Sequence, residues 1–268
     1  MRKLLHLSDL HFGRVDNSLV EPMVTMAQSL APDLVVVSGD FTQRARRTQF
    51  RAARIFLDRL PMPRLVVPGN HDIPLWDVVR RFASPLGRYR RYITDDLAPF
   101  YHDEEMAVLG INTARSLTRK YGRINALQIA HAGEVFAGIT SGVTKVVVTH
   151  HPFDLPPGSH SHLVGRAAMA MQGLAAAGVD LILSGHLHLQ HTGLTTKRYR
   201  IKGYSALVAQ TGTTISTRGR GEANSFNFIT IEREAISIAS HLWSPEQRQF
   251  LANPVARFVR SAEGWRPA

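Results

Sequence analysis

Short apolar runs alternate with helical patterns along the first two thirds of the chain. Six runs are rich in Val, Leu and Ile and nearly continuous, as expected of strands buried on both faces. They occupy residues 3–7, 33–39, 64–69, 106–112, 143–150 and 179–185. Helical patterns lie between them near residues 18–30, 44–60, 125–138 and 165–177. This alternation predicts a layered α/β core with much parallel strand pairing.

The last third of the chain has a different pattern. The stretches "YSALVAQTGTTIS", "SFNFITIE" and "AISIASHLW" read as successive strands with little helix between them. We therefore expect an antiparallel second sheet, and an α/β fold of two packed mixed β-sheets flanked by helices. We expect one domain over residues 1–268, with a polar, arginine-rich cap or flap at 74–104. The C-terminal extension at 244–268 reads as irregular, with a short helix.

Composition restricts the chemistry. The 268 residues are 44% hydrophobic and 20% charged, which is typical of a globular protein. With no cysteine, disulfides and thiolate metal sites are excluded, so any metal must be held by His, Asp, Asn or Glu. No apolar run has the length of a membrane span and the N-terminus lacks a signal-peptide pattern, so we expect a cytoplasmic protein.

The net charge of +11 favours anionic partners. Nucleic acid is not the favoured partner, because no basic stripe interleaved with aromatic residues is present. A small anionic phosphodiester agrees better with this charge. The sequence leaves open whether the protein forms a homodimer.

Polar residues capable of binding metal follow five of the six apolar runs. The segments are "SDLH", "SGDF", "PGNHD", "VTHHP" and "SGHLH", whereas the fourth run ends in "INTAR". The carboxyl ends of strands in α/β sheets share one edge, so these side chains should converge in space. The candidates are Asp9, His11, Asp40, Asn70, His71, Asp72, His150, His151, His186 and His188, with Asn112 from the fourth run.

The spacing of the candidates supports a shared site. Asp9 with His11, and His186 with His188, are two residues apart, so each pair can point to the same side at a strand end. Glycines before Asp40, Asn70 and His186 allow sharp turns. One histidine at a strand end is usually structural, but the ordered set D-x-H, G-D, G-N-H-D, H-x-P and G-H-x-H indicates a metal centre.

This ordered set, from Leu4 to His188, resembles that of the calcineurin-like metallophosphoesterases. It is most similar to their bacterial class III cyclic-nucleotide phosphodiesterases and the related glycerophosphodiesterases. The resemblance implies two metal ions, one held by Asp9, His11 and His188 and the other by Asn70, His150 and His186, with Asp40 bridging both. Ligands of this kind suit Mn, Fe or Zn. A water between two such cations would lose a proton and attack phosphorus.

The resemblance also implies roles for the neighbouring residues. His71 protonates the leaving group or stabilises the transition state, a role that suits imidazole. Asp72 either orients His71 or caps the next turn. His151 either lines the pocket or is structural, and Asn112 is a candidate phosphate contact.

The expected function is hydrolysis of small phosphodiesters, with 3′,5′-cyclic nucleotides such as cyclic AMP as the leading substrate class. A nuclease, a glycerophosphodiesterase or a lipid pyrophosphate hydrolase is the alternative within the same superfamily. A non-catalytic scaffold that kept the fold is a third interpretation, which the complete set of ligands disfavours.

Overall fold

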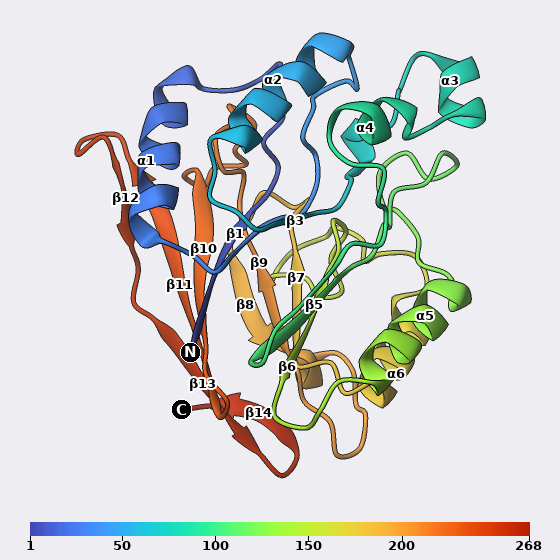
Figure 1. Ribbon diagram of the computed structural model, residues 1–268, viewed down its shortest axis with the longest axis vertical. Coiled ribbons are helices and arrows are strands. Elements are labelled where there is room, and N and C mark those ends of the chain that lie inside the picture. Colours follow the sequence, from blue (N-terminus) through green and yellow to red (C-terminus); the bar gives the residue numbers. More distant parts are fainter.

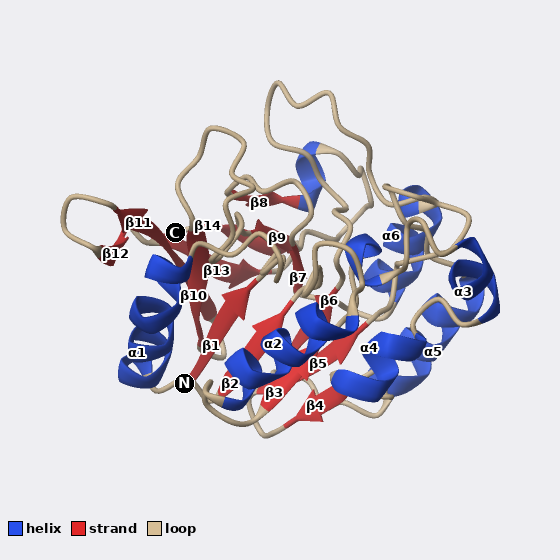
Figure 2. Ribbon diagram, turned by 90° about the horizontal axis from the view of Figure 1, so that it is seen from above, coloured by secondary structure: helices blue, strands red, loops and turns tan.

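The chain folds into two β-sheets packed face to face, with helices on the outer side of each sheet (Figure 1, Figure 2). A computed structural model describes all residues from 1 to 268. This architecture confirms the predicted α/β fold of two mixed sheets flanked by helices.

The first sheet combines strands from the two ends of the chain. Its members are β1 (Arg2–Leu7), β2 (Leu34–Val37), β3 (Arg64–Val66), β10 (Ser225–Ile231), β11 (Ala235–Ser244), β12 (Gln249–Ala252), β13 (Ala256–Ser261) and β14 (Gly264–Pro267). Their order is β14-β13-β11-β10-β1-β2-β3, with β12 paired to β11. The pairs β1–β2 and β2–β3 are parallel, whereas β10 to β14 pair antiparallel.

The second sheet is built from the middle of the chain. Its members are β4 (Phe100–His102), β5 (Met106–Gly110), β6 (Thr144–Val148), β7 (Leu181–Ser184), β8 (His191–Leu194) and β9 (Leu207–Gln210). The order is β4-β5-β6-β7-β9-β8. The four inner strands are parallel, and the edge strands β4 and β8 are antiparallel.

The chain forms six α-helices, five of which cover the sheets. They are α1 (Val20–Leu30), α2 (Arg47–Asp58), α3 (Val78–Ala83), α4 (Gly87–Tyr92), α5 (Ala126–Ala137) and α6 (Ala167–Ala176). Helices α1, α2 and α4 pack on the first sheet, and α5 and α6 pack on the second. None of the helices combines the length and apolarity needed to cross a bilayer.

The near-continuous apolar runs are explained by burial of both faces of each strand. Along β1, Leu4 packs between the two sheets with Val108 and Leu183 of the second sheet. The next residue, Leu5, packs against the helices on the outer side. Because successive side chains in a strand point to opposite faces, a strand covered on both faces needs apolar residues at every position.

Two predictions for the C-terminal third are wrong. The expected separate antiparallel sheet does not form, because β10 and β11 extend the first sheet and β9 pairs parallel with β7 in the second. The residues after Ser244, expected to be irregular with a short helix, form β12, β13 and β14. The tail is held by buried Phe258 and by Trp265, whose Nε1 donates to Asp180.

Candidate metal centre

The predicted metal ligands lie together at one edge of the two sheets, where β1, β2, β3, β6 and β7 end. All but one of them are buried, and Asn70 is half-buried. The structure therefore brings together side chains that are up to 179 positions apart, from Asp9 to His188. Convergence of the strand ends, as expected from the parallel order, produces this proximity.

An unusual backbone conformation directs these side chains inward. Five of the candidates have positive φ angles: 54° at Asp9, 47° at His11, 53° at Asp40, 72° at His186 and 57° at His188. This left-handed region costs a non-glycine residue about 1–2 kcal/mol. Such strain is concentrated at functional sites, where the surrounding structure holds it in place.

The first group of candidate ligands consists of Asp9, His11 and His188. The Asp9 Oδ1 atom lies 3.1 Å from His188 Nε2 and 3.4 Å from His11 Nε2, and these two nitrogens are 3.1 Å apart. The other carboxylate oxygen, Oδ2, accepts hydrogen bonds from Ser8 Oγ and from the main-chain nitrogen of His186. Oδ1 receives none, although it is buried.

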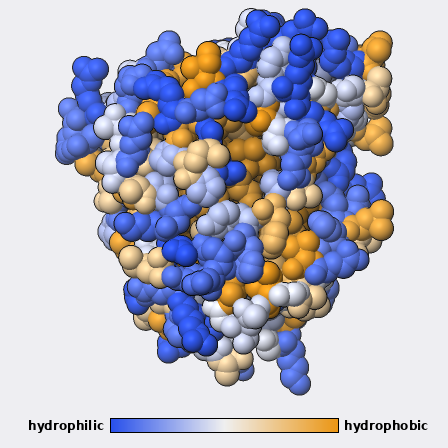
Figure 3. All heavy atoms as spheres, in the orientation of Figure 1, coloured by the Kyte–Doolittle hydropathy of each residue, from blue (hydrophilic) through white to orange (hydrophobic).

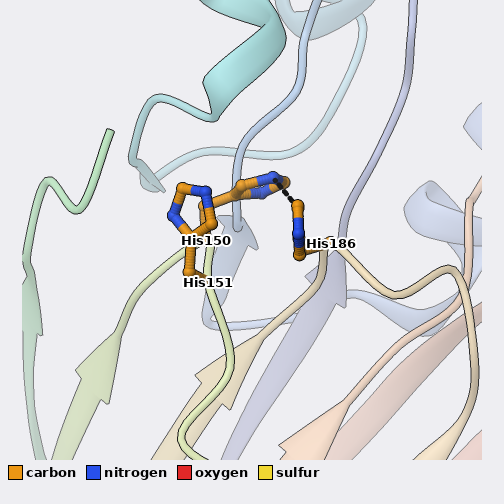
Figure 4. Close-up of side chains that lie close together, drawn as sticks. All are labelled: His150, His151 and His186. Atoms are coloured by element: carbon orange, nitrogen blue, oxygen red, sulfur yellow. Dashed lines mark hydrogen bonds between the residues drawn. The ribbon is translucent and has the colours of Figure 1, made fainter. Parts of the chain in front are cut away.

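The second group is formed around His150. Its Nε2 atom lies 3.2 Å from Asn70 Oδ1, 3.3 Å from His186 Nδ1 and 3.3 Å from Asp40 Oδ2. Figure 4 shows the rings of His150 and His186 turned toward each other. Because Asp40 Oδ2 is also 3.7 Å from His11 Nε2, this carboxylate stands between the two groups.

The arrangement of lone pairs fits bound cations. The Nδ1 atoms of His150 and His188 must donate, because their partners are the main-chain oxygens of Ser38 and Arg218. In a neutral ring Nε2 then carries only a lone pair, and it faces the carboxylate of Asp40 or Asp9. Converging lone pairs require a positive charge between them.

In the protein without metal, a proton can supply that charge. Burial lowers the pKa of His150, but the neighbouring Asp40 carboxylate outweighs burial and raises the pKa to about 9. The same arrangement of two carboxylates, four imidazoles and an amide, with no sulfur, suits a divalent cation of the Mn, Fe or Zn type. The residues present therefore fit a metal centre.

His71 stands beside the two groups. Its main-chain nitrogen donates to Asp40 Oδ1 at 2.8 Å, and its Nδ1 donates to the main-chain oxygen of Gln43 at 2.9 Å. This leaves Nε2 directed at Arg218, whose Nη1 is 2.9 Å away. The ring edge-packs against His11 with 4.9 Å between the ring centroids.

Sequence analysis did not identify Arg218. Its guanidinium contacts both His71 and His11, and its main-chain oxygen accepts the hydrogen bond from His188. The residue lies in the loop between β9 and β10, in the stretch "STRGRGEANSF". One arginine among many in a basic chain gives no local signal, so only the fold reveals its position.

A cavity of about 330 Å³ opens onto the centre. Five basic side chains line it, together with Asp40 as its single acid and with Ile73 and Leu75 as its apolar residues. The basic residues are Arg44, Arg119, Lys120, Arg218 and Arg220. No aromatic side chain other than histidine takes part, so the cavity offers charge rather than a surface for stacking.

Asp72 and Asn112 are engaged with the backbone. The buried carboxylate of Asp72 accepts from the main-chain nitrogens of Phe41, Thr42 and Gly69, so it holds together the turns after β2 and β3. These hydrogen bonds go to turns that precede Asp72 in the chain, not to the side chain of His71 or to the next turn. Asn112 Oδ1 accepts from the nitrogen of Ala114 within its own loop, and Asn112 does not line the cavity.

His151 is buried behind the second group. Its Nδ1 lies 2.7 Å from Thr113 Oγ1, and its ring centroid is 4.7 Å from that of His186. Its Nε2 has no hydrogen-bond partner. The ring also packs against Gly122, where a side chain would collide with it. His151 thus supports the loop that carries Arg119 and Lys120 to the cavity.

The chain resembles known proteins in sequence. The model of the calcineurin-like phosphoesterase family matches residues 2–190. Glycerophosphodiester phosphodiesterase GpdQ of Enterobacter lignolyticus (strain SCF1) is 35% identical over 111 residues, which cover 35% of this chain and 40% of that protein. The chain therefore matches less than half of this relative's length.

Solved structures share the fold. A structure of PhoD superposes with a TM-score of 0.71 at 12% identity and covers 100% of this chain and 71% of PhoD. Purple acid phosphatase PPD1 from yellow lupin (Lupinus luteus) seeds gives a TM-score of 0.68 at 10% identity, covering 94% of this chain and 52% of that protein. At these identities the likeness concerns the fold.

Proposed function

Since the chain belongs to the calcineurin-like phosphoesterase family, we propose that it is a metal-dependent phosphodiesterase acting on small phosphodiesters. The observation that carries the proposal is the set of buried lone pairs directed at one another beside a basic cavity. A cation at this centre would satisfy the lone pairs, and an anionic substrate would meet the cavity wall.

We assign two metal positions that share one carboxylate. The first would be held by Asp9, His11 and His188, the second by Asn70, His150 and His186, with Asp40 between them. When bound, such ions acidify a water molecule and neutralise charge on phosphoryl oxygens. The protein's own contribution is to fix the ligands through the hydrogen bonds from His150 to Ser38 and from His188 to Arg218.

His71 and Arg218 would act on the substrate from the side of the cavity. The hydrogen bond from His71 Nδ1 to Gln43 fixes the ring so that Nε2 faces the cavity and accepts from Arg218. When the Arg218 guanidinium turns to the substrate, Nε2 would take up a proton and could pass it to the leaving oxygen. The guanidinium of Arg218 is close enough to both His71 and His11 to bind a phosphoryl oxygen between them. Arg44, Arg119, Lys120 and Arg220 would attract the anion.

Cyclic nucleotides of the 3′,5′ type are our first substrate proposal, because a cyclic diester needs only a metal centre, a proton donor and a small cavity. Glycerophosphodiesters are the second, and two observations favour them. The cavity lacks an aromatic side chain on which a base could stack. The similarity to GpdQ also points to this class. We further expect a cytoplasmic location.

Hydrolysis of three diesters by the manganese-loaded protein tests the proposal. The substrates are 3′,5′-cyclic AMP, glycerophosphocholine and the generic diester bis(p-nitrophenyl) phosphate. The variants Asp40→Ala and His71→Ala remove a shared ligand and the proton donor. His160→Ala is the matched control, because His160 is an exposed histidine in the loop after β6 and lies outside the cavity.

The expected result is turnover of at least one diester that both site variants lose and the control keeps. Formation of AMP would support the cyclic-nucleotide class, and release of glycerol phosphate the second class. Cleavage of nucleic acid that weakens steeply with salt would favour a nuclease instead. Metal-bound protein that is inactive on the three diesters and on nucleic acid would favour a scaffold.

A further inference from the structure

An exposed apolar surface lies on α3 and the loop beside it. Monomeric proteins rarely expose several large apolar side chains together, and such patches mark interaction sites. Trp76 is 81% exposed, Val79 80% and Leu117 86%. We define the apolar patch as Trp76, Val78, Val79, Phe82 and Leu117. Figure 3 shows hydrophobic atoms at the edge of the molecule where Figure 1 places α3.

Arg81 joins the two parts of this patch. Its buried guanidinium donates to the main-chain oxygen of Pro74 at 3.0 Å and to that of Ser116 at 2.8 Å. Ser116 immediately precedes Leu117, so the loop after β5 is fixed next to α3. The loop that carries Leu117 therefore lies beside the exposed apolar side chains of α3.

The two segments that carry the patch are rich in basic residues, and several of these are exposed: Arg90, Arg91, Arg119, Lys120 and Arg123. Residues 73–94 contain five arginines and one acid, Asp77, which pairs with Arg80. Residues 112–124 contain four basic residues and no acid. Arg119 and Lys120 from this second segment also line the cavity, so the segment that carries Leu117 reaches the cavity wall.

We propose that the apolar patch docks on an anionic lipid surface. Trp, Val and Phe side chains would enter the interface between headgroups and acyl chains, while the exposed basic residues of the same two segments would meet the lipid phosphates. A second copy of the chain is the less favourable occupant, because a two-fold contact would place the basic residues of one copy against those of the other. This binding goes beyond the proposed hydrolysis and does not depend on it.

Sedimentation with vesicles tests the proposal. We expect the protein to bind vesicles that contain phosphatidylglycerol and not vesicles of phosphatidylcholine alone, with binding that weakens as salt rises. The double variant Val79→Ser, Phe82→Ser should bind about tenfold or more weakly, because two interfacial side chains are lost. Leu127→Ser is the matched control, since Leu127 on α5 is also 81% exposed but lies outside the patch.

Neither variant removes a cavity residue, so both should hydrolyse a small diester at the wild-type rate if the chain is an enzyme. Wild-type protein that ignores phosphatidylglycerol vesicles, or a double variant that binds them equally well, would overturn the proposal. So would a dimer in sedimentation velocity that the double variant alone converts to monomer, because the patch would then be an interface between copies.

Discussion

Replacing Arg218 with alanine should lower kcat/KM for bis(p-nitrophenyl) phosphate and leave the metal centre occupied. The side chain reaches the cavity with Nη1 2.9 Å from His71 Nε2 and 3.3 Å from His11 Nε2. The main-chain oxygen of Arg218 accepts a hydrogen bond from Nδ1 of His188, which orients the ring of this proposed ligand. Alanine keeps that oxygen.

The magnitude follows from the kind of contact. A hydrogen bond involving a charged group contributes about 1.5–3 kcal/mol, and loss of one donor to developing charge costs roughly 10²–10³ in rate. Arg218 is half-buried in a cavity that keeps four other basic side chains, so general attraction of the anion remains. We therefore expect a decrease of about 10- to 150-fold in kcat/KM, carried mainly by kcat.

Two controls separate this effect from a loss of charge or structure. Arg220→Ala removes an exposed cavity arginine that has no hydrogen bond to the ligands, and it should change kcat/KM by less than about threefold at physiological salt. Metal content by plasma mass spectrometry should equal that of the wild type in both variants. An Arg218→Ala enzyme with full metal content and wild-type kcat/KM would refute the assignment.

Three further outcomes follow from the same geometry. Chelation of the metal should lower Tm by about 5–10 °C, and added manganese should restore it. The reason is that metal at about 100 times its Kd adds roughly 2.7 kcal/mol to the free energy of unfolding. An unchanged Tm in differential scanning calorimetry would contradict the metal centre. His150→Ala should reduce bound metal by about one ion per chain. His151→Ala should retain the metal, because His151 supports a loop through its contact with Thr113. Equal metal losses from the two variants, measured by plasma mass spectrometry, would make His151 a ligand. Asp154→Asn should lower the free energy of unfolding by about 1–3 kcal/mol at neutral pH, because the carboxylate of Asp154 accepts hydrogen bonds from Arg198 and His191. Burial raises the pKa of Asp154, but the hydrogen bonds from His191 and Arg198 outweigh burial and lower it. The carboxylate therefore contributes its full stabilisation above the ordinary aspartate pKa of about 3.9. This stabilisation is lost as pH falls through the lower pKa that Asp154 has in the folded protein. Urea denaturation should show the difference between wild type and variant shrinking below about pH 4, and a constant difference would exclude the ion pair as its source.

The predicted parts of the fold are those with a local cause. Burial on both faces gives Leu4, Leu5 and their neighbours a continuous apolar pattern, and this pattern marks β1 to β3 and β5 to β7 without reference to the rest of the chain. Sheet membership has no such cause. Whether β9 pairs with β7 or with β10 depends on competition among distant strands, and the sequence pattern of β9 is the same in either sheet.

The tail shows a second limit. The strand β14 is only four residues long, and its exposed positions include Arg266 and Pro267. Its single buried anchor, Trp265, stays in place by donating to Asp180, which is 85 positions earlier in the chain. A short edge strand fixed by one distant contact has too weak a periodicity to be recognised. Arg218 was missed for the same reason, because its partners His11 and His71 are also distant in sequence.

The left-handed backbone of the proposed ligands supports the interpretation of this edge of the sheet as a metal site and not simply a set of strand ends. A strand that ends in ordinary extended conformation would carry Asp9 and His11 onward along its axis. Positive φ at both residues turns the chain, and the nitrogens of Asp9 and His11 instead bond to the main-chain oxygens of Gly39 and Asp40. The first two strand ends are thereby joined.

At about 1–2 kcal/mol for each of five such residues, the left-handed conformation opposes folding by several kcal/mol. The buried, mutually facing acceptors oppose it further in the absence of a cation. The left-handed backbone and the facing acceptors both oppose folding, so the stability of the fold does not explain why they occur at the same residues. A bound cation would compensate both, because it needs the acceptors close together and holds the turned backbone in place.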